Sequence, residues 1–260
     1  MAVIQKWAMT MVLLGGLTGV LASGAHAEAE ALRIGASHSL KPAFEEILPM
    51  FEREYGVPVR VVYGPSQTLR RQIEQGAAVD VFLPESVEEV DRLARKGLTL
   101  GGGTRVYAAS SLVLVMSAAS RATPISLPNR GARIAVADPK TSALGDVTVR
   151  GLIKANAAYK TGSNLVYGQH SEDVMRLVES GKADAGIVHR VDAIGSAEMR
   201  IIDEIPAGRH IAVQFGGAIV STCREASLPA AEQFLDFMTS PLIQKLLLKY
   251  GFDQVPSSNG

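Results

Sequence analysis

Short strand patterns alternate with amphipathic helical patterns early in this chain, and that alternation limits the folds it can adopt. After the first strand pattern, Phe44, Ile47 and Phe51 recur at helical spacing, and Gly56 ends the helix. Because a helix follows each strand, the strands are expected to run parallel in one sheet. The strand patterns are LRIGA (32–36), VPVRVVY (57–63) and VDVFL (79–83), and the helical patterns span 40–56, 66–76 and 86–97.

A second α/β unit is expected between about residues 110 and 205. Before it, LTLGGGTRVYAASS (98–111) interrupts the alternation. Its three glycines are expected to form a plain loop, because a phosphate-binding loop would continue into Lys-Ser or Lys-Thr and a helix. The chain closes with the β-rich stretch HIAVQFGGAIVS (210–221) and two helices interrupted at Pro241. No internal repeat is evident by eye.

The first 27 residues are expected to be a secretory signal peptide. Lys6 precedes a short apolar stretch that ends in Ala25-His26-Ala27, an A-x-A cleavage pattern, and no cysteine follows to carry a lipid. A membrane anchor is the alternative, but the apolar run is short and rich in glycine. The chain has a formal net charge of +0, which provides no steering toward nucleic acid or an anionic membrane. Cys223 is the single cysteine, so no internal disulfide can form.

Four strand-to-helix junctions are rich in hydroxyls and small residues. In an open α/β sheet such junctions gather beyond the carboxyl ends of the strands, where ligands bind. Each brings a helix amino terminus whose unpaired N–H groups attract anions, and Ser39 and Ser66 would add O–H donors. The alternative for each serine is an ordinary helix cap. The junctions are GASHSL (35–40), GPSQTL (64–69), DPKTSALG (138–145) and GQHSEDV (168–174).

Two other kinds of chemistry were weighed against an anion site. GASHS is not a nucleophile elbow, because Ser39 replaces the second glycine of G-x-S-x-G, although a hydrolase using His189 or His38 as base stays possible. A metal carrier would use His38, His170 and His189, but no H-x-x-x-H or cysteine pair supports a metal site. We therefore expect no catalytic residue and no direct ligand to a metal cation.

Several stretches resemble the periplasmic molybdate-binding proteins of bacterial ABC transporters, which are type II substrate-binding proteins. The most specific is PSQTLRRQIEQGAAVDVFLPES (65–86), and the resemblance covers nearly all of the chain after residue 27. It implies an α/β fold of two lobes, each a mainly parallel sheet flanked by helices, with the ligand cleft between them. The other matching stretches are AVADPKTSALG (135–145), SEDVMRLVESGKADAGIVHRVDA (171–193) and SPLIQKLLLKYGF (240–252).

The same resemblance implies the lobe boundaries. Lobe 1 would comprise residues 28–109 with 211–260, and lobe 2 residues 110–210. The chain would cross between them near YAASS (107–111) and AGRHIAV (207–213), and these crossings would form a hinge.

The resemblance also implies which residues hold the ligand. In the family, two serine hydroxyls and several backbone amides surround a tetrahedral oxyanion. Position by position, the serines are Ser39 and Ser66. The backbone donors fall at Leu144, with Ala143 as the alternative, and at Val174. Two positions depart from the family pattern: His189 stands where a tyrosine is usual, and His38 where a small residue is usual.

These residues lead to a functional expectation. A periplasmic, monomeric binding protein would capture molybdate or tungstate without a cofactor and deliver it to an ABC permease, with no role in nucleic-acid binding. Molybdate and tungstate are unprotonated dianions that need only donors, and their similar size and charge prevent a choice between them. Another oxyanion or an organic acid stays open. If His38 and His189 face the ligand and are protonated, affinity should rise as the pH falls.

Overall fold

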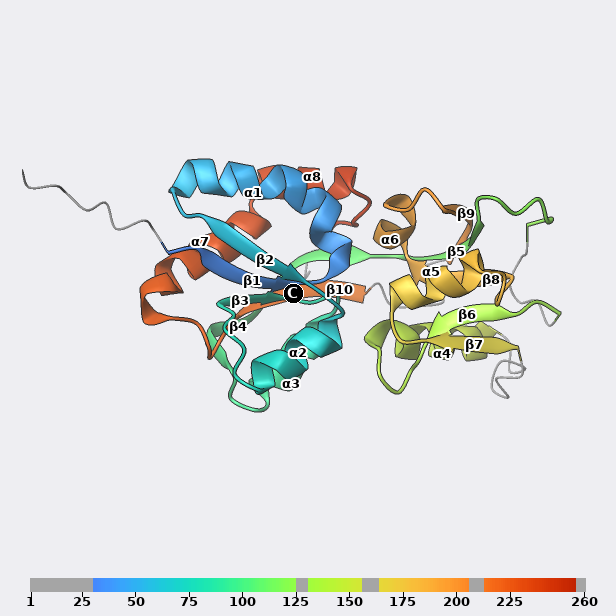
Figure 1. Cartoon of the computed structure of the whole chain (residues 1–260), viewed down its shortest axis with the longest axis horizontal. Helices are drawn as coiled ribbons and strands as arrows, with labels where there is room; N and C mark the ends of the chain where they lie inside the picture. The colour runs from blue at the N-terminus through green and yellow to red at the C-terminus, as the bar shows by residue number, and fades with distance from the viewer. Residues whose placement is uncertain (1–29, 125–130, 156–163, 206–212, 256–260) are drawn as a thin grey trace, which may run out of the picture.

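The computed structural model describes residues 30–124, 131–155, 164–205 and 213–255. The predicted signal peptide and most of the predicted crossing at 207–213 lie outside these ranges. The described chain forms two lobes, each built on a five-stranded sheet with helices against it (Figure 1).

The first lobe contains the sheet β2-β1-β3-β10-β4. Strands β1, β2 and β3 are parallel, whereas β10 is antiparallel to both β3 and β4. Helices α1, α7 and α8 lie on one side of this sheet, and α2 and α3 lie on the other (Figure 1). The elements are β1 (Leu32–Ala36), η1 (His38–Leu40), α1 (Lys41–Tyr55), β2 (Val59–Tyr63), α2 (Ser66–Glu74), β3 (Val81–Leu83), α3 (Val87–Ala94), β4 (Thr99–Ser110), β10 (Val213–Val220), η4 (Glu225–Ser227), α7 (Leu228–Thr239) and α8 (Pro241–Lys249).

The apolar spacing of α1 has the predicted effect on packing. Phe44, Ile47 and Phe51 are fully buried, and Gly56 ends the helix in the left-handed conformation that glycine adopts easily. The rings of Phe44 and Phe51 meet Phe234 of α7 edge-on, with centroids 6.2 and 5.0 Å away. These contacts pack α1, which begins directly after η1, against α7.

The second lobe contains the sheet β7-β6-β8-β5-β9. Strands β6, β7 and β8 are parallel, whereas β5 is antiparallel to both β8 and β9. The elements are β5 (Leu112–Ser117), β6 (Ile134–Ala137), α4 (Ala143–Ala155), β7 (Leu165–Gly168), α5 (Ser171–Glu179), β8 (Ala185–His189), α6 (Arg190–Ile194) and β9 (Met199–Glu204).

The prediction of a plain loop at 98–111 is wrong, because most of this stretch is strand β4. It pairs along β10 with two register shifts, and its Gly101 and Gly103 have φ values of 49° and 82°. Glycines and bulges hide the alternation of a strand, and for this reason the pattern was missed. The chain continues through Ser111 directly into β5 of the other lobe. The carboxyl group of Asp253 binds the Ser111 amide, so the C-terminal segment supports this crossing.

The two sheets repeat one topology, although no repeat was evident in the sequence. Strands β2-β1-β3-β10-β4 correspond in order to β7-β6-β8-β5-β9. In each lobe an arginine at the start of the middle one of the three parallel strands makes the same three hydrogen bonds, from its amide, Nε and Nη2, to an aspartate before a neighbouring strand. The pairs are Arg33 with Asp80 and Arg133 with Asp184.

The two pairs differ mainly in burial. The Asp80 side chain is 0 % exposed and also binds Arg224 at 2.9 Å, whereas the Asp184 side chain is 38 % exposed. Burial acts to raise the pKa of Asp80, but hydrogen bonds from Arg33 and Arg224 bring that pKa below its usual value. Loss of the Asp80 carboxylate would leave two guanidinium groups without their buried partner.

Asp80→Asn should therefore destabilise the protein more than Asp184→Asn. We expect a loss of about 3–5 kcal/mol for the buried site and less than about 1 kcal/mol for the exposed one. Because the folded pKa of Asp80 is depressed, its contribution is present above the unfolded pKa and is lost as the pH falls through the folded pKa. Urea unfolding of both variants at pH 7 and at about pH 3 measures this difference. Equal losses at pH 7 would contradict it.

Candidate functional site

A small pocket lies between the lobes where three of the four predicted junctions meet. Its volume is about 60 Å³. Lobe 1 provides the start of α2 and the end of β3, and lobe 2 provides the junctions before α4 and α5. Larger hollows of about 630 and 310 Å³ lie elsewhere on lobe 2, away from the junctions before α2 and α4. The interlobe pocket is lined by Pro65, Ser66, Gln67, Thr68, Arg71, Glu85, Ser142, Gln169 and His170.

Ser66 begins α2 and is buried at this pocket. Pro65 before it has a φ of −58°, which the proline ring favours. The Ser66 hydroxyl accepts a hydrogen bond of 3.0 Å from the Glu85 amide. A hydroxyl has one donor and two acceptor positions, so this bond leaves the Ser66 proton available to a ligand.

Ser39 lies in η1, beside the pocket rather than among the residues that line it. Its hydroxyl accepts a hydrogen bond of 3.2 Å from the Ser37 hydroxyl, and its amide donates a hydrogen bond of 3.3 Å to that same hydroxyl. Across the cleft it faces Asp192 of α6, whose carboxyl also lies against Ser171. Burial raises the pKa of Asp192 to about 6, and hydrogen bonding to the two serines opposes this rise. The hydroxyl of Ser39 thus lies near a buried carboxyl group of the other lobe.

The backbone donors predicted in lobe 2 differ in availability. Ala143 and Leu144 are the first two residues of α4, and their amides have no acceptor among the described residues. The Val174 amide instead donates to the His170 carbonyl at 3.1 Å. The reason is its position: His170 caps α5, and Val174 is the first residue far enough along to reach an intrahelical acceptor. A ligand would meet the amides of the preceding turn before that of Val174.

The two unusual histidines do not share an environment. His38 is exposed and places its Nδ1 3.1 Å from a carboxylate oxygen of Glu172 in the other lobe. Its ring also lies 6.4 Å from Tyr63. His189 ends β8, is 0 % exposed, and packs its ring 5.3 Å from Phe215. These contacts place His38 at the mouth of the cleft and His189 in the packing beneath it.

His170 lines the pocket, although the sequence suggested it only as a metal ligand. Its Nδ1 lies 2.6 Å from Glu172 and its Nε2 lies 3.5 Å from Asp173. The hydrogen bond to Glu172 raises the pKa of His170, against the opposite effect of burial. No group of three histidine, cysteine or acidic side chains that could hold a metal ion occurs within the described ranges.

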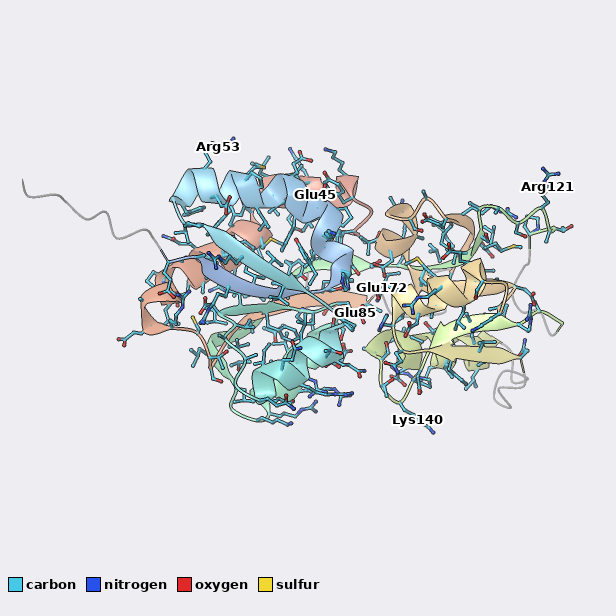
Figure 2. The ribbon with its side chains drawn as sticks, viewed as in Figure 1. Glu45, Arg53, Glu85, Arg121, Lys140 and Glu172 are labelled. Carbon is cyan, nitrogen blue, oxygen red and sulfur yellow. The ribbon has the colours of Figure 1, made fainter. Side chains whose placement is uncertain are left out.

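Carboxyl groups from both lobes gather at the cleft. Glu85 follows β3 in lobe 1, and Figure 2 shows it beside Glu172 at the boundary between the lobes. Burial and the nearby carboxyls of Asp192, Glu172 and Glu89 raise the pKa of Glu85 well above its usual value. Sequence reasoning missed Glu85 and Asp192 because neither lies in a hydroxyl-rich junction. Their positions just after β3 and β8, at the edge where ligands gather, were the available signal.

Comparison with known proteins gives the family. The model of the bacterial extracellular solute-binding proteins matches residues 32–253. The chain belongs to this family. It is a solute-binding protein and not an enzyme. No helix among the described residues is long and apolar enough to cross a membrane.

Individual relatives agree with this assignment. Over 256 residues the chain is 27 % identical to the molybdate-binding protein ModA of Escherichia coli, with 95 % of this chain and 98 % of that protein covered. The periplasmic molybdate-binding protein of Azotobacter vinelandii shares the fold with a TM-score of 0.71 and 22 % identity, over 86 % of this chain and 99 % of that one. The sulfate-binding protein SubI of Mycobacterium tuberculosis shares the fold with a TM-score of 0.69 and 17 % identity, over 87 % of this chain and 88 % of that one.

The contact of His170 with Glu172 makes a testable prediction about protonation. In Glu172→Gln, the pKa of His170 should fall toward the ordinary value of about 6.5, because its main stabilising partner loses its charge. An NMR titration of the His170 ring measures this value. Glu179→Gln, at the exposed far end of α5, is the control and should leave it unchanged. A His170 pKa that is the same in wild type and Glu172→Gln would contradict the assignment.

Proposed function

We propose that this protein captures a tetrahedral oxyanion, molybdate or tungstate, between its lobes and delivers it to an ABC permease. The observation that carries the proposal is the pocket in which Ser66 of lobe 1 meets Ser142 and His170 of lobe 2. The amino termini of α2, α4 and α5 all open onto it. Hydroxyls, first-turn amides and a protonated imidazole are donors suited to a small anion.

Binding would work by closure of the two lobes. Residues 28–109 with 211–260 would move against residues 110–210 about the crossings near 107–111 and 207–213. Neither lobe provides a full set of donors alone, so an ion that contacts both stabilises the closed state. Ser39 and Ser66 would donate from lobe 1, and the Leu144 amide, with Ala143 as the alternative, from lobe 2. Val174 could donate only if its bond to His170 opened or became shared.

A second candidate keeps the fold and changes the ion. SubI, a neighbour in fold, binds sulfate by its name. The cleft of the present chain also contains Glu85 and Asp192, which could accept a proton from a protonated anion such as hydrogen phosphate. Sulfate and phosphate therefore belong in any test beside molybdate and tungstate.

The setting of the protein follows from the same proposal. Residues 1–27 would direct export to the periplasm, where the mature chain would act as a monomer that binds no nucleic acid. It would need no cofactor, because capture and release change no covalent bond. The permease would recognise the closed form.

Calorimetric titration with molybdate, tungstate, sulfate and phosphate tests the proposal. Ser39→Ala and Ser66→Ala should each weaken binding of the preferred ion by about 1.5–3 kcal/mol, the usual value of a hydrogen bond to a charged group. Ser180→Ala is the matched control, because that hydroxyl bonds only within its own helix at the exposed end of α5. The affinity of Ser180→Ala for the preferred ion should equal that of the wild type.

Two outcomes would contradict the proposal in different ways. If none of the four ions binds, the protein is not an oxyanion receptor. If an ion binds but both serine variants match the wild type, the site lies elsewhere in the cleft.

A further inference from the structure

Glu85 is fixed at the centre of the proposed site. It follows β3, lines the interlobe pocket, and its amide donates to the Ser66 hydroxyl at 3.0 Å. This bond holds the residue beside a predicted ligand donor. The pocket has a volume of about 60 Å³, which leaves little room for water between the Glu85 carboxyl group and a bound ion. This carboxyl group must therefore either contribute to ion binding or oppose it.

The charged groups around Glu85 come mainly from the other lobe. On its own lobe, Arg71 is an exposed residue of the pocket rim, and Glu89 of α3 is engaged by Arg70 at 2.6 Å. From lobe 2, the carboxyls of Glu172 on α5 and Asp192 on α6 face it.

The histidines at the cleft do not neutralise Glu85. His38 and His170 both lie against Glu172, with their Nδ1 atoms 3.1 and 2.6 Å from its carboxylate oxygens. Asp192 lies near the hydroxyls of Ser39 and Ser171, and one of its carboxyl oxygens has no hydrogen-bond partner among the described residues. Among the described residues, the Glu85 carboxyl has no cationic partner. The two lobe-2 carboxyls approach it only when the lobes are together, so closure itself disfavours its ionised form.

We propose that Glu85 takes up a proton as the lobes close and donates its O–H to the bound oxyanion. This inference rests on the proposed function and adds a residue that determines specificity. The proton comes from solvent, moves to the Glu85 carboxylate, and stays there while the ligand is bound. An ionised Glu85 would repel a dianion, whereas the protonated group provides a donor beside that of Ser66. The electrostatic effect is strengthened because the site is small and confined between the two lobes.

The proposal predicts proton-linked binding of a fully deprotonated ion. Titration of the wild type with molybdate at pH 7, in two buffers of different ionisation enthalpy, should show uptake of close to one proton. The affinity should fall by up to about tenfold per unit as the pH rises above 7. In Glu85→Gln, an uncharged amide keeps a donor in place, so the uptake should fall by close to one proton and the affinity should depend less on pH. Glu88→Gln, on the exposed face of α3, is the control and should behave as the wild type.

The outcomes separate this inference from the function on which it rests. A wild type that binds none of molybdate, tungstate, sulfate and phosphate overturns both. Binding without proton uptake in the wild type, or uptake that is unchanged in Glu85→Gln, overturns only the role of Glu85. Phosphate binding that is lost specifically in Glu85→Gln also overturns it, because Glu85 would then accept a proton from the ligand rather than donate one.

Discussion

The structure depends on one arginine–aspartate pair that occurs once in each lobe. Arg33 with Asp80, and Arg133 with Asp184, join the start of β1 to that of β3 and the start of β6 to that of β8, which are neighbouring parallel strands. In both lobes this pair occupies the amino ends of the strands. The carboxyl ends are then free to open into helix amino termini, and the two lobes turn those ends toward each other. The position of the pocket follows from this arrangement, because the groups proposed to bind an anion are collected on the two edges that meet.

The cleft combines donors for an anion with carboxyl groups that oppose one. Helix termini, serine hydroxyls and His170 favour a negative ion, whereas Glu85, Glu172 and Asp192 disfavour it unless they are paired or protonated. Glu172 is paired: burial acts to raise its pKa, but hydrogen bonds with His170 and with its own amide bring that pKa below the usual value. Its carboxylate thus occupies the amino terminus of α5, where an anionic ligand would otherwise be placed. A bound ion and this side chain compete for the same donors.

Much of the fold followed from the sequence, because apolar spacing and strand–helix alternation are local signals. The buried face of α1 and the position of Ser66 at a helix start are examples. Strand β4 was missed because its glycines and register shifts remove the alternation. The repeat between the lobes was missed because it is preserved only in short pieces. IEQGAAVD (73–80) corresponds to VESGKAD (178–184) with one residue inserted, and Arg33-Ile34 corresponds to Arg133-Ile134. The carboxyls of Glu85 and Asp192 were missed because their proximity arises only from the meeting of two lobes, which no local pattern encodes.

The same reasoning explains why the ligand is harder to predict than the fold. Tetrahedral oxyanions of similar size are held by similar hydroxyls and amides, so these donors alone discriminate weakly between them. These ions differ more clearly in whether they carry a proton. An ionised carboxylate in the pocket favours a protonated ion, whereas a neutral carboxyl group favours a fully deprotonated one. Whether Glu85 is ionised depends on Glu172 and Asp192 of the opposite lobe, and therefore on closure. If Glu85 acts as proposed, the choice of ion and the closing of the lobes are coupled, and specificity depends on the acidic residues as well as on the serines.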